Sequence, residues 1–527
     1  MTDTSSTIAE GLMADRVVVV GAGIGGLVAA LGLACRGLDV TLLDRAGAPG
    51  GKMREVEVAG LRLDAGPTVF TMRWVLDAVF AGAGARLEDH LTLRPAAILA
   101  RHAWPDGSRL DLFADTERTA DAVQAFAGAR EAAGFRAFTA QARAIYATLE
   151  APFIRGQRPT MAGLVRSAGL AEMWRTRPFD TLWSALSQHF ADPRLQQLFG
   201  RYATYCGSSP FLAPATLMLV AHVEREGVWM VEGGMHRVAV ALATLAAARG
   251  VTVRMGADVA EVLVSRGRAA GVRLRDGEQI EASAVVVNAD PAALSAGLLG
   301  AAARGAVPPL PPAERSLSAL TWAAVARVRG FPLHRHTVFF SGDYAAEFAA
   351  LRQGGLPVQP TTYVCAEDRD DGCAAPDGPE RLLILVNAPA TGDTRPPTET
   401  EIAQCRDRTF SHLTQAGLQL TDVQAVTTGP AEFHSLFPGT GGALYGPAVH
   451  GATATFKRPG SRTRVPGLYL AGGGTHPGAG VPMAALSGGL AAESLVQDLA
   501  STRLSRPAAM PGGTWTRSAT TGGTASR

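Results

Sequence analysis

The sequence predicts an α/β protein whose parallel sheet is assembled from separated segments, with an α+β domain inserted between them. Three observations predict this class: a valine run followed by glycines at 16–26, a second group of strand and helix patterns between 230 and 300, and a strand followed by a helix near residue 470. At 527 residues, the chain also exceeds what one hydrophobic core usually supports.

The first segment has the pattern of a β-α-β unit. Residues 16–20 form an unbroken β-branched run, which is typical of a buried parallel strand. A helix is predicted over 24–36, ending before Gly37, and a second strand over 40–43 ends at Asp44.

Later segments complete the predicted organisation. The patterns predict strands at 250–254, 259–264, 271–274, 284–288 and 467–471, and helices at 238–249 and 482–499. Within the inserts we expect helices at 135–146 and from 182 to about 190, and strands at 337–340 and 382–386. The first domain then comprises 15–100, 230–300 and 461–500, and the second comprises 101–229 and 301–460. The ends, 1–14 and 501–527, are polar or rich in small residues and are predicted to be disordered.

Composition excludes several classes of protein. The formal net charge is +2, which does not favour a nucleic-acid partner, and the five cysteines form no pattern typical of disulfides or of a metal site. Hydrophobic residues make up 47% of the chain and charged residues only 18%. The apolar stretch 17–35 contains the glycines of a strand-to-helix turn, and no signal peptide is apparent, so a cytoplasmic location is expected.

The glycines between the first strand and helix carry the first chemical signal. Gly21, Gly23, Gly25 and Gly26 lie in a G-x-G-x-x-G pattern, which is typical of a tight turn that brings a pyrophosphate to the N-terminus of a helix. Asp44 is placed to accept the ribose hydroxyls of a dinucleotide, although a solvated strand end is the alternative.

A second glycine pair follows the strand that ends at Asp44. Gly50 and Gly51 offer bare backbone to the same pyrophosphate, and the nearby cations are expected to bind the cofactor as well: Arg45, Lys52 and Arg54. An ordinary loop, and for Arg54 a surface ion pair, are the alternatives. Val259, at the start of a later strand, is also expected to contact the cofactor.

The C-terminal glycine segment decides which dinucleotide is expected. Gly473 and Gly474 precede Pro482 and Met483, which open the last predicted helix. A helix N-terminus at the isoalloxazine ring favours the negative charge of a reduced flavin. Two glycine turns over 400 residues apart therefore predict FAD and a Rossmann-like FAD-binding domain of the glutathione-reductase/amine-oxidase type.

Five segments together resemble the bacterial phytoene-desaturase-type carotenoid desaturases over about residues 15–500. The segments are 18–27, 49–52, 63–68, 231–237 and 474–482. Met483 stands where phytoene desaturases usually carry Gly, and Asp44 where they often carry Glu. With 436–446, Met483 resembles the hydroxyneurosporene (methoxyneurosporene) desaturase branch.

The resemblance implies an FAD enzyme that introduces a C-3,4 double bond into 1-hydroxy or 1-methoxy acyclic carotenoids. Hydride would pass to the flavin, a proton would leave the adjacent carbon, and oxygen or a quinone would accept the electrons. It also implies a hydrophobic carotenoid substrate and peripheral contact with the inner membrane. Phytoene desaturation, carotenoid isomerisation, amine oxidation and a non-redox lipid chaperone of the same fold are the alternatives.

Individual residues leave alternatives open. His476 is the candidate catalytic proton acceptor, or else its imidazole caps the glycine loop; His236 either faces phosphate or only opens a helix. Tyr202, Tyr205 and Tyr445 either line a tunnel or belong to the core.

The segment 152–183 alternates apolar residues with arginines. This composition is typical of an interfacial helix pair, with an amphipathic helix packed on its own domain as the alternative. No metal site is expected.

Overall fold

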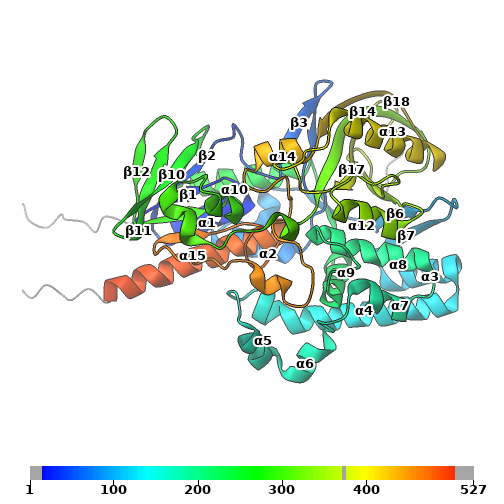
Figure 1. The fold of residues 1–527 in the computed structure, drawn as a ribbon, viewed down its shortest axis with the longest axis horizontal. Helices are drawn as coiled ribbons and strands as arrows, with labels where there is room; N and C mark the ends of the chain where they lie inside the picture. Colours follow the sequence, from blue (N-terminus) through cyan, green and yellow to red (C-terminus); the bar gives the residue numbers. More distant parts are fainter. Residues whose placement is uncertain (1–14, 371–375, 505–527) are drawn as a thin grey trace, which may run out of the picture.

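The computed structural model describes residues 15–370 and 376–504; the disorder predicted for 1–14 and for 505–527 lies outside the described residues. Figure 1 shows two sheets side by side, with a helical layer beneath the second sheet. The α/β class is confirmed, with a parallel sheet in one part and an inserted α+β part in the other.

The parallel sheet has the strand order β19-β13-β1-β2-β9. Its strands are β1 (Arg16–Val20), β2 (Asp39–Asp44), β9 (Thr252–Met255), β13 (Ala284–Val287) and β19 (Leu468–Leu470). All four neighbouring pairs are parallel, with Val17 opposite both Val40 and Ala284. Strands predicted from three distant segments therefore meet in one sheet, and its central strand β1 leads directly into the glycine turn.

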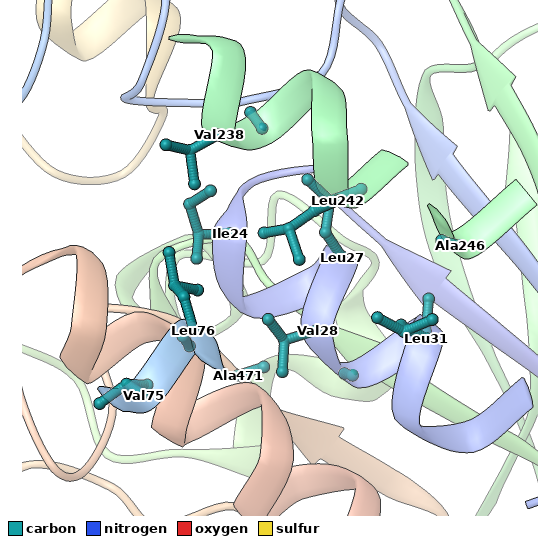
Figure 2. Packing of buried hydrophobic residues seen from close by; sticks show 14 of the residues in the cluster. Ile24, Leu27, Val28, Leu31, Val75, Leu76, Val238, Leu242, Ala246 and Ala471 are labelled. Atoms are coloured by element: carbon teal, nitrogen blue, oxygen red, sulfur yellow. The ribbon is translucent and has the colours of Figure 1, made fainter. Parts of the chain in front are cut away.

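Both faces of β1 are covered, because successive side chains point to opposite sides of a strand. Val17 and Val19 pack on a helical layer, whereas Val18 and Val20 pack on a small antiparallel sheet. The helices of that layer are α1 (Ile24–Ala34), α2 (Arg73–Gly82), α10 (His236–Ala248) and α15 (Val481–Leu504). Figure 2 shows Leu27 and Val28 of α1 between Leu242 of α10 and Leu76 of α2. The small sheet consists of β10 (Val259–Ser265), β11 (Arg268–Leu274) and β12 (Gln279–Glu281).

A seven-stranded mixed sheet forms the base of the inserted part, in the order β18-β14-β17-β16-β15-β6-β7. Its strands are β6 (Ile98–Ala103), β7 (Arg109–Phe113), β14 (Ser318–Gly330), β15 (His336–Phe339), β16 (Thr362–Ala366), β17 (Glu380–Ala388) and β18 (Leu418–Thr428). Helix α13 (Glu399–Gln415) packs against one face of it, and the hairpin of β3 (Glu55–Val58) and β4 (Leu61–Asp64) against the other.

The helical layer of the inserted part lies below this sheet in Figure 1. Its helices are α3 (Thr116–Ala127), α4 (Ala129–Leu149), α5 (Met161–Ala168), α6 (Leu170–Arg175), α7 (Leu182–His189), α8 (Pro193–Gly200) and α9 (Leu219–Arg225). The other strands and α-helices of the described residues are β5 (Leu93–Pro95), β8 (Trp229–Val231), α11 (Pro291–Ser295), α12 (Tyr344–Arg352) and α14 (Pro430–Leu436). The expected end of a helix near residue 190 is observed, because Asp192 caps the next helix, in which Pro193 is the first residue.

Two of the expected boundaries fall inside elements of the structure. Helix α15 continues to Leu504, past residue 501, at which the tail was expected to begin. The expected domain boundary at residue 100 falls inside β6, whose backbone pairing with β7 and β15 ties it to the second sheet. Among residues 15–370 and 376–504, the structure contains no helix with the length and hydropathy needed to span a bilayer.

Candidate functional site

A cavity of about 1980 Å³ runs along the junction of the two parts. It exceeds the 300–1,000 Å³ typical of a single small-molecule pocket. The lining includes the glycine turn at Gly21 and Gly23, the second pair at Gly50 and Gly51, and the C-terminal segment 471–484. The three segments singled out in the sequence therefore border one space, which is large enough for a dinucleotide and a second ligand.

The first glycine turn joins β1 to α1. Gly21 adopts a φ of +102°, and a Cβ on Gly26 would overlap the carbonyl oxygen of Gly21, so the turn requires glycine at both positions. Among the described residues, no side chain caps the N-terminus of α1. Its first backbone N–H groups are therefore available to an anionic group such as a pyrophosphate.

Asp44, at the end of β2, braces this turn. Its Oδ2 accepts the backbone N–H of Ala22 at 2.6 Å, and its Oδ1 accepts that of Ala46 at 2.8 Å. Asp44 also lines the cavity. Each carboxylate oxygen keeps acceptor capacity for a hydroxyl donor, so the expected ribose contact is compatible with this geometry.

The second glycine pair lies against the first turn. The N–H of Gly50 donates to the carbonyl of Ala22 at 2.8 Å, and a Cβ on Gly51 would lie 3.2 Å from the Cα of Gly23. His236, at the start of α10, donates from Nε2 to the carbonyl of Pro49 at 2.9 Å. His236 lines the cavity and thus both opens its helix and holds this loop.

The three predicted cations line the cavity, but each is engaged by the protein. Arg45 donates to the carbonyls of Ser435 and Leu436 at 2.7 and 2.6 Å, at the end of α14. Lys52 donates from Nζ to the carbonyl of Leu444 at 2.6 Å, and burial lowers its pKa. Arg54 donates to Thr428 Oγ1 at 3.2 Å. These residues therefore join the side of the cavity that carries the glycine turns to the end of β18, to α14 and to the loop that follows α14.

The C-terminal segment is held in place by a residue that the sequence did not indicate. Arg458 is buried, and its Nη1 donates to the carbonyl of Gly473 at 2.8 Å. Its Nη2 donates to the carbonyls of Tyr445 and Pro447 at 2.7 and 2.9 Å. Gly473, Gly474, Pro482 and Met483 all line the cavity, and α15 begins one residue before Pro482.

Asn288, directly after β13, is a second residue that the sequence analysis did not select. Its Nδ2 donates to the carbonyl of Gly21 at 3.2 Å. A Cβ on Gly25 or on Gly472 would lie 2.6 Å from its Oδ1. Asn288 therefore fills the gap between the N-terminal and C-terminal glycine turns. Val259, the first residue of β10, is buried and lines the same cavity beside Ala257.

His476 does not occupy the position expected of a proton acceptor. It is buried, its Nε2 is 3.0 Å from the carbonyl of Gly156, and its ring packs edge-on against Phe153. Burial lowers its pKa to about 4. His476 is not among the described residues that line the cavity, so its geometry favours the alternative role of holding the loop.

Many of the buried residues that line the cavity are apolar, and the wall also carries the buried ion pair of Arg201 and Glu224. Leu149, Ile154, Leu164, Val220 and Val223 are among its lining residues. Tyr205 and Tyr445 line it as well, whereas Tyr202 packs in the core behind them. Arg201 and Glu224 are buried at the same wall and hydrogen-bond to Tyr205.

The outer end of the cavity carries exposed apolar side chains. Leu170, Trp174 and Phe179 are 72%, 70% and 76% exposed, and Met161 is 44% exposed. All four line the cavity and belong to α5, α6 or the turn after them, which project at the bottom of Figure 1. Helix α6 contains no buried residue. We call these four side chains the apolar rim.

The fold and the paired glycine turns define an FAD-dependent oxidoreductase. The chain belongs to the flavin containing amine oxidoreductase family, whose model matches residues 24–496. It is 56% identical to a hydroxyneurosporene desaturase of Rubrivivax gelatinosus, over 98% of this chain and 100% of that protein. It is 50% identical to the hydroxyneurosporene desaturase of Cereibacter sphaeroides, over 92% of this chain and 98% of that protein.

A solved structure of putrescine oxidase bound to putrescine shares the fold. It has a TM-score of 0.55 and 16% identity, and the likeness covers 92% of this chain and 99% of that one. We call the glycine turns at 21–26, 50–51 and 472–474 the glycine cradle. The cradle fits FAD, because its glycines leave the backbone uncovered by side chains and the first amides of α1 have no side-chain cap. In the described ranges 15–370 and 376–504, no group of three or more metal-ligating side chains was found.

Proposed function

We propose that the protein is a carotenoid desaturase that introduces a C-3,4 double bond into 1-hydroxy or 1-methoxy acyclic carotenoids. The observation that carries the proposal is the apolar cavity that extends from the glycine cradle to the apolar rim. An amine oxidase would need a polar pocket for its substrate. The identity of 47–56% to hydroxyneurosporene desaturases supports the choice of substrate.

The proposed cofactor residues divide into two groups. Gly21, Gly23, Gly25, Asp44, Gly50, Gly51 and Val259 line the cavity and would hold the dinucleotide, Gly26 would keep the first turn closed, and Gly473, Gly474, Pro482 and Met483 would border the ring. Arg45, Lys52 and Arg54 would act by fixing the end of β18, α14 and the loop after α14 beside the ring.

The reaction needs little from ionisable side chains. When bound, FAD supplies a two-electron acceptor that takes a hydride from an allylic carbon. The adjacent carbon would lose a proton to solvent at the open end of the cavity, and the polyene would delocalise the positive charge between the two events. Leu149, Ile154 and Val223 exclude water from this space, so the chain contributes mainly by positioning.

The apolar rim is proposed to contact the cytoplasmic face of the inner membrane. The substrate is insoluble in water, and the rim places Trp174 and Phe179 at the outer end of the cavity that would receive it. Oxygen or a quinone would then take the electrons from the reduced cofactor.

The test is anaerobic incubation of the purified protein with 1-hydroxyneurosporene, neurosporene or phytoene in liposomes, with a quinone supplied. We expect a product with red-shifted absorption from the hydroxylated substrate. Conversion of phytoene alone would instead identify a phytoene desaturase. A colourless protein that does not take up flavin would leave only a lipid carrier.

A further inference from the structure

A hydrogen-bonded cluster of three polar side chains lies in the wall of the cavity, which also carries other polar lining residues such as Thr68 and Tyr363. Arg201 and Tyr205 come from the short helix η3 (Arg201–Cys206), and Glu224 comes from α9. The side chains of Arg201 and Glu224 are 7% and 4% exposed. Since removing charges from water is costly, and apolar residues of similar size often stabilise a protein as well, stability alone gives no reason for a charged group at this wall.

The hydrogen bonds within this cluster converge on the phenol of Tyr205. Tyr205 accepts from Arg201 Nη1 at 2.6 Å and donates to Glu224 Oε1 at 2.8 Å. Tyr202, behind the wall, donates to the other oxygen of Glu224. A phenol oxygen has two acceptor lone pairs, so one lone pair of Tyr205 remains after the bond from Arg201. Tyr205 is only half-buried and lines the cavity, unlike Tyr202.

Contacts link the cluster to the C-terminal glycine segment. Gly207 follows η3 directly, and a Cβ there would overlap the ring of Tyr445. The carbonyl of Tyr445 accepts from Arg458, which also donates to the carbonyl of Gly473. A Cβ on Gly446 would lie 3.0 Å from the Cα of Gly474. The wall that carries Tyr205 therefore packs on the loop that supports the proposed ring site.

We infer that Tyr205, held by Arg201 and Glu224, accepts a hydrogen bond from the C-1 hydroxyl of the carotenoid. This inference rests on the proposed function and adds a residue that determines specificity. A hydroxyl drawn into an apolar cavity needs a partner, because an unpaired buried polar group costs free energy. In the proposed reaction the new double bond begins two carbons from C-1, so the partner must lie close to the reacting carbons, and the wall that carries Tyr205 packs on the loop beside the proposed ring site.

The experiment compares 1-hydroxyneurosporene with neurosporene in liposomes, by anaerobic reduction of the bound flavin. For the unmodified protein we expect kcat/KM to favour the hydroxylated substrate about 10- to 100-fold. Tyr205→Phe should lower that ratio to about unity, mainly by slowing reaction of the hydroxylated substrate. Tyr146→Phe, a buried tyrosine that is not among the lining residues, is the matched control and should keep the ratio.

The outcomes separate the inference from the proposed function. If the unmodified protein is reduced by both carotenoids at equal rates, or if Tyr205→Phe keeps the native ratio, the inference fails and the desaturase proposal stands. If neither carotenoid reduces the flavin, the proposed function fails, and the inference fails with it. If Tyr205→Phe does not fold, equal rates for the two carotenoids in the unmodified protein still overturn the inference.

Discussion

The carboxylate of Asp64 caps the N-terminus of α10, where its Oδ1 accepts the backbone N–H of His236 at 3.0 Å. Its Oδ2 accepts the N–H of Met235 at 2.5 Å. A Cβ on Gly234 would lie 2.8 Å from the same Oδ2, so the approach requires glycine. Two of the segments that carried the family resemblance, 63–68 and 231–237, thus meet through one helix cap, which favours a negative charge.

A second buried carboxyl group next to this cap predicts a pH-dependent stability. Glu367 Oε1 accepts the N–H of Asp64 at 2.9 Å, and burial together with repulsion from Asp64 raises the pKa of Glu367 to about 8. The folded protein keeps a proton that the unfolded chain releases near pH 4.3. The resulting stabilisation is complete below that pH and is lost as the pH rises through 8.

We therefore expect Glu367→Gln to flatten the fall in Tm between pH 6 and pH 9, measured by thermal unfolding. Glu399→Gln, an exposed residue of α13, is the control and should keep the slope of the native protein. Identical slopes for native protein and Glu367→Gln would contradict the assignment.

The close packing of Gly26 against Gly21 predicts that adding a single methyl group at residue 26 causes loss of the cofactor. In Gly26→Ala the added methyl group overlaps the carbonyl of Gly21, so the first turn must open at a cost of about 1–3 kcal/mol. We expect little FAD per protein after purification, measured by flavin absorbance. Gly82→Ala, at the exposed end of α2 where a Cβ meets nothing within 4 Å, should keep its FAD and its Tm.

The sequence predicted the elements of the parallel sheet because their signals are local. The valine run that forms β1, the glycines after it and Asp44 lie within thirty residues of one another, and each has its own periodicity or turn requirement. Two distant glycine segments predicted FAD as the cofactor, and membership of the flavin containing amine oxidoreductase family confirms this prediction.

The contacts that assemble the site were not predictable in the same way. Arg458 and Asn288 lie outside the glycine motifs, and their partners Gly473 and Gly21 are set by the tertiary fold. The orientation of the Lys52 side chain depends on the carbonyl of Leu444, nearly 400 residues away in the sequence. The Asp64 cap likewise joins parts of the chain 171 residues apart. Sequence patterns give the residue types of such contacts but not their partners.

His476 is predicted to position the loop rather than to accept the proton. Gln keeps a donor that can reach the Gly156 carbonyl, so His476→Gln should retain turnover within about tenfold. His476→Ala loses this bond at a cost of about 1 kcal/mol.

The lowered pKa of His476 also predicts a pH-dependent stability. Since the pKa of His476 in the folded protein is about 4, the stability that His476 contributes is present above its unfolded pKa near 6.5. It is lost as the pH falls towards 4, and His476→Gln should remove this component of acid unfolding. Loss of turnover in His476→Gln with flavin content unchanged would restore the role of proton acceptor.

The apolar rim predicts binding to a lipid surface that depends on hydrophobic side chains more than on charge. Arg175 and Arg177 of this region form salt bridges with Glu172 and Asp180, so these four side chains have no net charge with which to attract anionic headgroups. Leu170, Trp174 and Phe179 are free to enter the interface, and burial of such a side chain contributes about 1.5–3 kcal/mol. We expect the protein to float with liposomes of neutral lipid. The double variant Trp174→Ser, Phe179→Ser should lower the bound fraction at least tenfold.

Val358→Ser, which removes a similarly exposed apolar side chain outside the rim, is the control and should leave flotation unchanged. Failure of the unmodified protein to float, or equal losses for rim and control variants, would remove the membrane contact from the proposal, because the rim would then have no particular affinity for lipid.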